Sequence, residues 1–211
     1  MTYYLPQEIE EKSFQIITEE LQEMGIEVEE KIAPILKRVI HTSADFEYVE
    51  NLKISDTAID EALKALEEGC VIVTDTNMAL AGISKPSLAK LGCEACCYIS
   101  DEDVKNKAKE QGTTRATQAI IKASEVEKPL ILAIGNAPTA LIQLTDMIER
   151  GEIAPKLIIG VPVGFVNVVE SKELIMKSSI PYIVAKGRKG GSNVAAAIVN
   201  AILYMKNPSR M

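Results

Sequence analysis

The stretch PLILAIGN, residues 129–136, decides the fold class. It is a short apolar run that ends in Gly and Asn, and an apolar helical pattern over residues 140–150 follows it. Apolar runs of this length, bounded by turn residues, are typical of strands that are covered on both faces. The stretch therefore predicts one strand-then-helix unit of a parallel sheet.

Further runs of the same kind lie on both sides of this stretch. They are CVIVTD (70–75), EACCYIS (94–100), KLIIGVPVG (156–164) and PYIVAKG (181–187). Helical patterns at 113–126, 168–178 and 194–205 separate or follow most of them. Strands that alternate with helices indicate a mainly parallel sheet. We expect an α/β domain with a mainly parallel sheet of about five strands.

The residues before the first of these runs are predicted to be mostly helical. One apolar face runs from Ile9 to Met24 and ends at Gly25, and a second pattern covers residues 29–40. Asp56 is placed to cap a third helix that stops at Gly69. No repeat or linker interrupts the chain, so we expect a single domain over 1–211, mostly helical over 1–69 and with alternating strands and helices over 70–211. The helical start is expected to wrap the sheet or to form a dimer surface.

Composition and charge exclude several classes of partner. Hydrophobic residues make up 47% of the chain and charged residues 25%, which favours a folded core. The net charge of -7 argues against binding nucleic acid or an anionic membrane. A few local cations and helix N-termini can still hold an anionic small molecule. No signal peptide and no apolar run of membrane-spanning length is visible, so we expect a cytoplasmic protein.

The cysteines do not predict a metal site. Cys93 and Cys96 form a CxxC pair next to Cys97, but Cys70 is alone and no second pair completes a set of four ligands. We expect reduced, mostly buried thiols.

Turn residues that follow the predicted strands indicate where a ligand binds, because open parallel sheets bind ligands beyond the carboxyl ends of their strands. In GRKGGSNVAAA (187–197), Gly190 and Gly191 leave the backbone bare, and Arg188 and Lys189 add charge. Ser192 or Asn193 is expected to cap the following helix and leave its N-terminus for an anion. An ordinary glycine-rich connection would read the same way, and the residues leave both interpretations open.

Three charged side chains near predicted strand or helix ends have two interpretations each. Arg115 lies in the first turn of a predicted helix, where a positive charge interacts unfavourably with the helix dipole. It is either a residue that binds a carboxylate through two hydrogen bonds or a solvated surface residue. Asp75 and Glu170 are candidate acids at strand ends. We expect Asp75 to cap a turn and Glu170 to pair with Lys172 or a neighbour.

His41 is the only histidine in the chain, within RVIHTSADFEYVE (38–50). Histidine has the unperturbed pKa nearest neutral pH, so His41 is either a proton donor or acceptor or a surface residue. The chain has no GxSxG elbow and no HExxH motif. A single imidazole beside backbone-rich anion pockets suits an isomerase or a lyase whose substrate supplies most of the reactivity.

Taken together, several segments resemble the precorrin-8X methylmutase family. They run in order over nearly the whole chain: Ser13-Phe14, His41, AGIS ending at Ser84, TTR ending at Arg115, GNAPTAL (135–141), PVGFVNVVESK (162–172) and GRKGGS (187–192). The resemblance implies a three-layer α/β/α, Rossmann-like fold and a homodimer. It also implies an enzyme that moves a methyl group from carbon 11 to carbon 12 of an acidic corrin precursor, a tetrapyrrole. No cofactor and no protein-bound metal is implied, and cobalt enters only as part of the substrate.

The resemblance also implies roles for particular residues. His41 matches the family's active-site histidine and is expected to donate a proton or a hydrogen bond to the ring. Arg115 and Ser13 match ligand contacts, and Ser84 stands where relatives carry Thr. The residues expected to bind substrate are Ser13, Ser84, Arg115, Gly135, Asn136, Gly164, Arg188, Gly190, Gly191 and Ser192.

The resemblance leaves the form of the ring open. Relatives act on a metal-free ring to give hydrogenobyrinate, or on a cobalt-loaded ring to give cobyrinate, and the use of Lys, Glu and Ile favours the cobalt form. A non-catalytic tetrapyrrole carrier and a carboxylate-handling lyase remain as alternatives.

Overall fold

Strand β4 (Leu130–Ile134) lies inside a sheet whose two faces are both covered. In the computed structural model, which describes residues 6–207, all five of its residues are buried. Leu130, Leu132 and Ile134 pack into one hydrophobic cluster, whereas Ile131 and Ala133 pack into the cluster on the opposite face. This alternation requires helices on both sides of the sheet, as a continuous apolar run predicts.

The sheet within the described residues has six strands in the order β1-β6-β5-β4-β2-β3. The other strands are β1 (Leu52–Ile54), β2 (Val71–Thr74), β3 (Glu94–Cys96), β5 (Leu157–Gly160) and β6 (Tyr182–Ala185). All neighbours are parallel except β1, which pairs antiparallel with β6. The three-layer, mainly parallel α/β prediction is confirmed, and β1 is a sixth strand that was not predicted. Its three residues LKI are too few to show a period.

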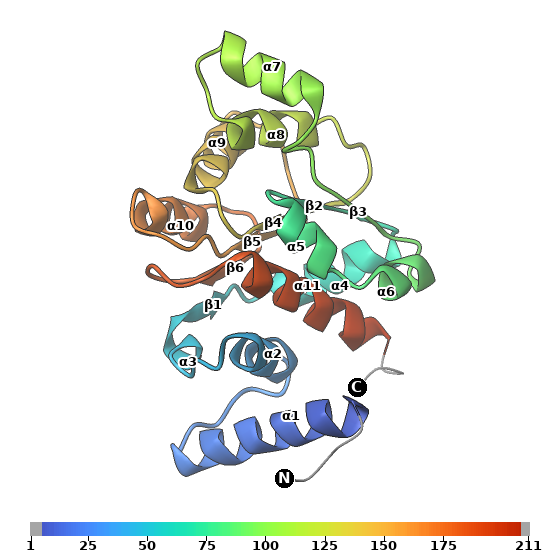
Figure 1. Ribbon diagram of the computed structural model, residues 1–211, viewed down its shortest axis with the longest axis vertical. Helices are drawn as coiled ribbons and strands as arrows, with labels where there is room; N and C mark the ends of the chain where they lie inside the picture. The colour runs from blue at the N-terminus through green and yellow to red at the C-terminus, as the bar shows by residue number, and fades with distance from the viewer. Residues whose placement is uncertain (1–5, 208–211) are drawn as a thin grey trace.

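Helices cover the two faces of the sheet in separate groups (Figure 1). Their bounds are α1 (Pro6–Glu23), α2 (Ala33–Ser43), α3 (Tyr48–Asn51), α4 (Ala58–Glu67), α5 (Asn77–Gly82), α6 (Lys85–Lys90), α7 (Glu102–Glu110), α8 (Arg115–Ala123), α9 (Pro138–Glu149), α10 (Val168–Lys177) and α11 (Ser192–Lys206). Buried residues of α8, α9 and α10 share the cluster with Leu132, and those of α4 and α11 share the cluster with Ile131.

The N-terminal helices form a further layer outside α11. Figure 1 shows α2 against α11 and α1 outermost, and residues of all three helices belong to one hydrophobic cluster. Helix α11 is apolar around most of its circumference because it lies between the sheet and α2. The expected helical start therefore extends the three layers rather than wrapping the sheet.

Several helix boundaries differ from the predicted ones. The second helix begins at Ala33, with Pro34 in its first turn, and not at residue 29. Asp56 does not cap α4, which follows Thr57 without a side-chain cap. The short helices α5 and α6 lie in a segment where turn residues were predicted, and α7 lies in a segment for which no element was predicted. Short helices carry little periodicity. Within residues 6–207, no helix is long and apolar enough to cross a bilayer.

Candidate functional site

Asp75 ties together the loops that follow β2 and β4. Its carboxylate accepts hydrogen bonds from the backbone N–H groups of Gly135, Asn136 and Ala137 at 2.7–2.9 Å. After β2 the chain continues to β3, on one side of the adjacent pair β2–β4, whereas after β4 it continues to β5, on the other side. The carboxyl ends of β2 and β4 therefore form the topological switch point of the sheet. Burial raises the pKa of Asp75, and the three N–H donors act in the opposite direction. Asp75 therefore caps a turn, as predicted, but the turn is the one after β4 and not its own.

The glycine-rich loop over residues 187–191 lies against the loops after β4 and β5. A Cβ on Gly190 would lie 2.1 Å from the carbonyl oxygen of Val161, and Gly190 has a φ of +153°. A Cβ on Gly135 would lie 2.7 Å from the Cα of Ser192. Only glycine permits these approaches, so Gly135 and Gly190 are required by packing between the loops. This loop is therefore more than a flexible connection.

Ser192 does not cap α11, contrary to the prediction, and neither does Asn193. The residue before the helix is Gly191, and the Ser192 hydroxyl pairs at 2.8 Å with the hydroxyl of Thr76 in the loop after β2. Thr76 caps α5 by accepting from the N–H of Ala79. The start of α11 is thereby fixed to the loops after β2 and β4.

Lys172 lies beneath the glycine-rich loop, and sequence reasoning did not identify its role. Its side chain is fully buried, and its ammonium donates to the carbonyl oxygens of Gly187 and Lys189, each at 2.8 Å. The predicted pair between Glu170 and Lys172 is wrong, because Lys172 lies in the core whereas Glu170 is exposed. Desolvation lowers the pKa of Lys172 to about 8.

The charged side chains of the loop point in different directions. Lys189 forms ion pairs with Asp45 at 2.6 Å and Glu47 at 2.9 Å, which join this loop to the segment after α2. Arg188 is exposed and lies over the ring of Phe165, in the loop after β5 that also contains Gly164. Because Lys189 is already paired, Arg188 is the loop side chain that remains available to an anion.

Arg115 lies at the rim of the same edge. It begins α8, is exposed, and follows Thr114, whose hydroxyl caps that helix and contacts the hydroxyl of Thr139 at the start of α9 at 3.0 Å. Asn136 is exposed in the loop that Asp75 holds. The Thr114–Thr139 contact thus places Arg115 near the start of α9, which follows the loop after β4.

His41 lies on the last turn of α2, with its side chain exposed. Its ring stacks on Phe14 of α1 with centroids 5.3 Å apart, and Arg38 covers the same Phe14 ring at 5.0 Å. Among the described residues, neither imidazole nitrogen has a hydrogen-bond partner, so both can reach a ligand. Ser13, next to Phe14, donates its hydroxyl to the carbonyl of Ile9 within its own helix.

Ser84 is held by Asn200 of α11. The Asn200 side chain accepts from the N–H of Ser84 and donates to the carbonyl of Gly82, both at 2.8 Å. A Cβ on Gly82 would lie 2.8 Å from that of Ala196, one turn earlier in α11. Asn200 thus fixes the backbone conformation at Ser84, and no sequence motif indicates this role.

Replacing Asn200 by alanine is expected to destabilise this corner of the protein. The change removes two hydrogen bonds and leaves a backbone N–H and a carbonyl without them, at a cost of about 1–2 kcal/mol. Thermal unfolding should show a lower melting temperature for Asn200→Ala than for Asn106→Ala, which changes an exposed amide of α7. Equal melting temperatures would mean that water replaces the Asn200 contacts without loss.

The four cysteines are free thiols, and two of them lie at this edge: Cys96 ends β3, where its carbonyl accepts from the hydroxyl of Thr74 at 3.3 Å, and Cys97 follows it. Cys70 and Cys93 are buried with sulfurs 3.8 Å apart, whereas Cys96 and Cys97 are half-buried. Burial raises the pKa of Cys96 and Cys97. Cys97 lies beyond β3, so the predicted strand over 94–100 ends earlier than expected. In the part of the chain that the structure describes, no cluster of three or more His, Cys, Asp or Glu could hold a metal ion.

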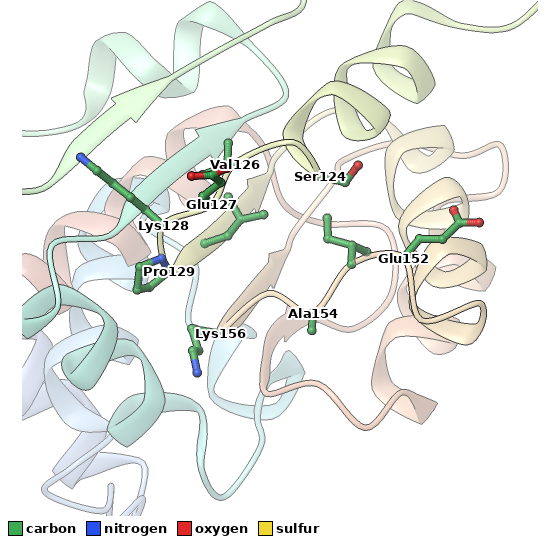
Figure 2. Close-up of a pocket in the computed structure, with 10 residues that line it drawn as sticks. Ser124, Val126, Glu127, Lys128, Pro129, Glu152, Ala154 and Lys156 are labelled. Carbon is green, nitrogen blue, oxygen red and sulfur yellow. The ribbon is translucent and has the colours of Figure 1, made fainter.

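A cavity of about 340 Å³ lies at the amino ends of the strands, between the segments that lead into β4 and β5. Figure 2 shows its lining, which includes Lys128, Pro129, Glu152 and Lys156. None of the residues expected to bind substrate lines it. The residues expected to act on the substrate lie instead in the loops after the strands, at the starts of α8 and α11, and on α1 and α2.

Comparison with known proteins identifies the family. Residues 8–205 match the protein-family model for precorrin-8X methylmutase (CbiC). A cobalt-precorrin-8 methylmutase of Leptospira interrogans is 45% identical, covering 96% of this chain and 95% of that protein. A precorrin-8X methylmutase of Pseudomonas aeruginosa is 38% identical, covering 93% and 94%.

A solved structure agrees with these matches. The precorrin-8x methyl mutase from Thermus thermophilus superimposes with a TM-score of 0.85 at 34% identity, covering 96% of this chain and 99% of that one. The agreement extends over the sheet, both helical layers and the N-terminal helices. The chain therefore belongs to the precorrin-8X methylmutase family, isomerases of cobalamin biosynthesis.

Proposed function

We propose that this protein moves a methyl group from carbon 11 to carbon 12 of cobalt-precorrin-8, giving cobyrinate. The observation that carries the proposal is the match to the family over residues 8–205, which contain every residue expected to bind substrate. The cobalt form is favoured because the Leptospira relative, 45% identical, is named for it, whereas the Pseudomonas relative named for the metal-free ring is 38% identical. One family match over this range also supports a single domain.

His41 is the proposed proton donor to the ring. Two observations support this role: the ring stacks on Phe14, and neither of its nitrogens has a hydrogen-bond partner among residues 6–207. Protonation, or a strong hydrogen bond, at a ring nitrogen draws electron density through the conjugated system and lowers the barrier to migration. The methyl group moves within one molecule, so His41 takes the proton back before the product leaves.

The anionic side chains of the ring are proposed to bind the cations at the strand ends. Arg188 and Arg115 are both exposed there, and a guanidinium can hold a carboxylate with two parallel hydrogen bonds. No cofactor is needed for this rearrangement, and any cobalt arrives inside the substrate. These local cations allow a protein with a net charge of -7 to bind an acidic ligand.

The protein is further proposed to be a homodimer and to act in the cytoplasm. The family resemblance supports the homodimer, and so do the exposed apolar side chains of Val163, Phe165 and Val166, of which Phe165 is 79% exposed. Contiguous exposed apolar residues are typical of interaction surfaces.

The test is to incubate the protein separately with cobalt-precorrin-8 and with precorrin-8X and to follow the visible spectrum. We expect conversion of both rings or of the cobalt ring alone, with the cobalt ring faster. Faster conversion of the metal-free ring would contradict the proposed substrate but not the reaction. Binding of both rings without conversion would identify a carrier instead, and binding of small acids alone would identify a lyase.

A further inference from the structure

Lys172 is a buried cation with no anion beside it. Its side chain is fully buried, yet within residues 6–207 no carboxylate lies within the 4.0 Å limit of an ion pair with its ammonium. Burying a charge without a counter-charge is costly, and the pKa of Lys172 is lowered to about 8 for this reason. A methionine would fill the same space at lower cost, so the charge calls for an explanation.

The ammonium sets the direction of two peptide groups. In a trans peptide the C=O and the N–H point in opposite directions. Because the carbonyls of Gly187 and Lys189 point at Lys172, the N–H groups of Arg188 and Gly190 point away from it. Neither of these N–H groups donates to another residue that the structure describes. Two free donors therefore face away from the buried charge, on the loop that carries the exposed Arg188 side chain.

The rest of the loop supports the same orientation. The N–H of Gly191 donates to the carbonyl of Val161 at 2.8 Å, and the N–H of Gly164 donates to the carbonyl of Arg188 at 3.1 Å. These bonds hold the loop from the β5 side while Lys172 holds it from α10. The backbone of residues 187–191 is therefore fixed before any ligand arrives, which reduces the entropy lost on binding.

We propose that Lys172 is a positioning residue that aims the N–H groups of Arg188 and Gly190 at a carboxylate of the corrin substrate, and that this carboxylate is the counter-charge of the buried ammonium. The inference rests on the proposed function. Lys172 does not touch the substrate. It acts through the two carbonyls and through its charge, which in the low-dielectric interior acts more strongly than in water.

Burial lowers the pKa of Lys172 to about 8, within the range between pH 7 and pH 9.5. The charged side chains on the elements packed against α10, and on α10 itself, are Asp146 and Glu149 on α9, Arg188 and Lys189 on the loop, and Glu170, Glu173 and Lys177. Strands β5 and β6 carry none. Hydrogen bonds to Asp45 and Glu47 raise the pKa of Lys189, so its titration lies higher.

The first test is a titration of the wild-type protein with cobyrinate between pH 7 and pH 9.5, followed by visible absorption. The anion binds the protonated form of Lys172, so affinity is highest below the pKa and falls as pH rises through it. We expect the affinity to fall by about twofold at pH 8 and to approach a total loss of about tenfold by pH 9.5, the loss expected for a neutral side chain at this position. Calorimetry at pH 8.5 in buffers of different ionisation enthalpy should show proton uptake on binding. A flat affinity without proton uptake would overturn the inference.

The second test compares Lys172→Met with Lys177→Met, which changes an exposed lysine of the same helix. Lys172→Met should bind cobyrinate about tenfold more weakly at pH 7 and lose the pH dependence, because the carboxylate loses its aimed donors and their charge. Lys177→Met should keep wild-type affinity and slope. If Lys172→Met also keeps both, the positioning role is wrong while the methylmutase function stands. If the wild-type protein neither converts nor binds a corrin ring, the proposed function fails and this inference fails with it.

Discussion

Replacing His41 by alanine is expected to stop methyl migration and leave ring binding intact. The imidazole is exposed on α2 and none of its described neighbours holds either nitrogen, so its loss leaves the fold unchanged. Removal of a general acid typically costs a factor of about 10²–10⁴ in rate. The measurement is the visible spectrum of cobalt-precorrin-8 incubated with each variant, together with a titration that records binding.

Thr42→Ala is the matched control, since Thr42 is the next exposed residue on the same turn of α2. It should convert the ring at the wild-type rate. Conversion by His41→Ala at that same rate would show that His41 serves packing against Phe14 and that proton donation comes from elsewhere. Loss of both conversion and binding would assign His41 to substrate binding instead of proton transfer.

Replacing Asp75 by alanine is expected to have the largest effect on stability. The change leaves the N–H groups of Gly135, Asn136 and Ala137 without their acceptor in a buried position. A buried donor without a partner costs about 1–3 kcal/mol, so we expect the free energy of unfolding to fall by about 3 kcal/mol or more. Denaturant unfolding followed by circular dichroism measures this difference.

Asp60→Ala provides the comparison for Asp75. Asp60 is 66% exposed and pairs with Lys31, and an exposed ion pair contributes about 1 kcal/mol or less. A loss for Asp75→Ala no greater than that of Asp60→Ala would mean that water enters the switch point and satisfies the three donors. Asp75 also holds the loop that carries Asn136. We therefore expect the folded Asp75→Ala protein to bind the ring more weakly than the wild-type protein does.

The resemblance to a known family and the local pattern predicted different parts of the site. The order of the motifs identified His41, Ser84 and Arg115, and the structure places all three on exposed or half-buried positions where a ligand can reach them. Whether each of them binds the ring stays a prediction. The roles of Lys172 and Asn200 were not predicted, because they depend on carbonyl and N–H groups of residues distant in the sequence. Motif spacing carries no information on such contacts.

The amino-acid pattern was sufficient to predict the fold class and the positions of the loops that follow the carboxyl ends of the strands. Apolar runs such as residues 129–136 specify buried strands because only a covered sheet can hide them, and the helical periods between them require parallel pairing. Tertiary structure alone decided the antiparallel strand β1, the single-turn and two-turn helices and the contacts of Asp75 and Lys172. Short elements gain their stability from packing against the rest of the molecule, and buried polar groups take whichever partner the fold supplies. Neither the stability of a short element nor the partner of a buried polar group is a local property of the sequence.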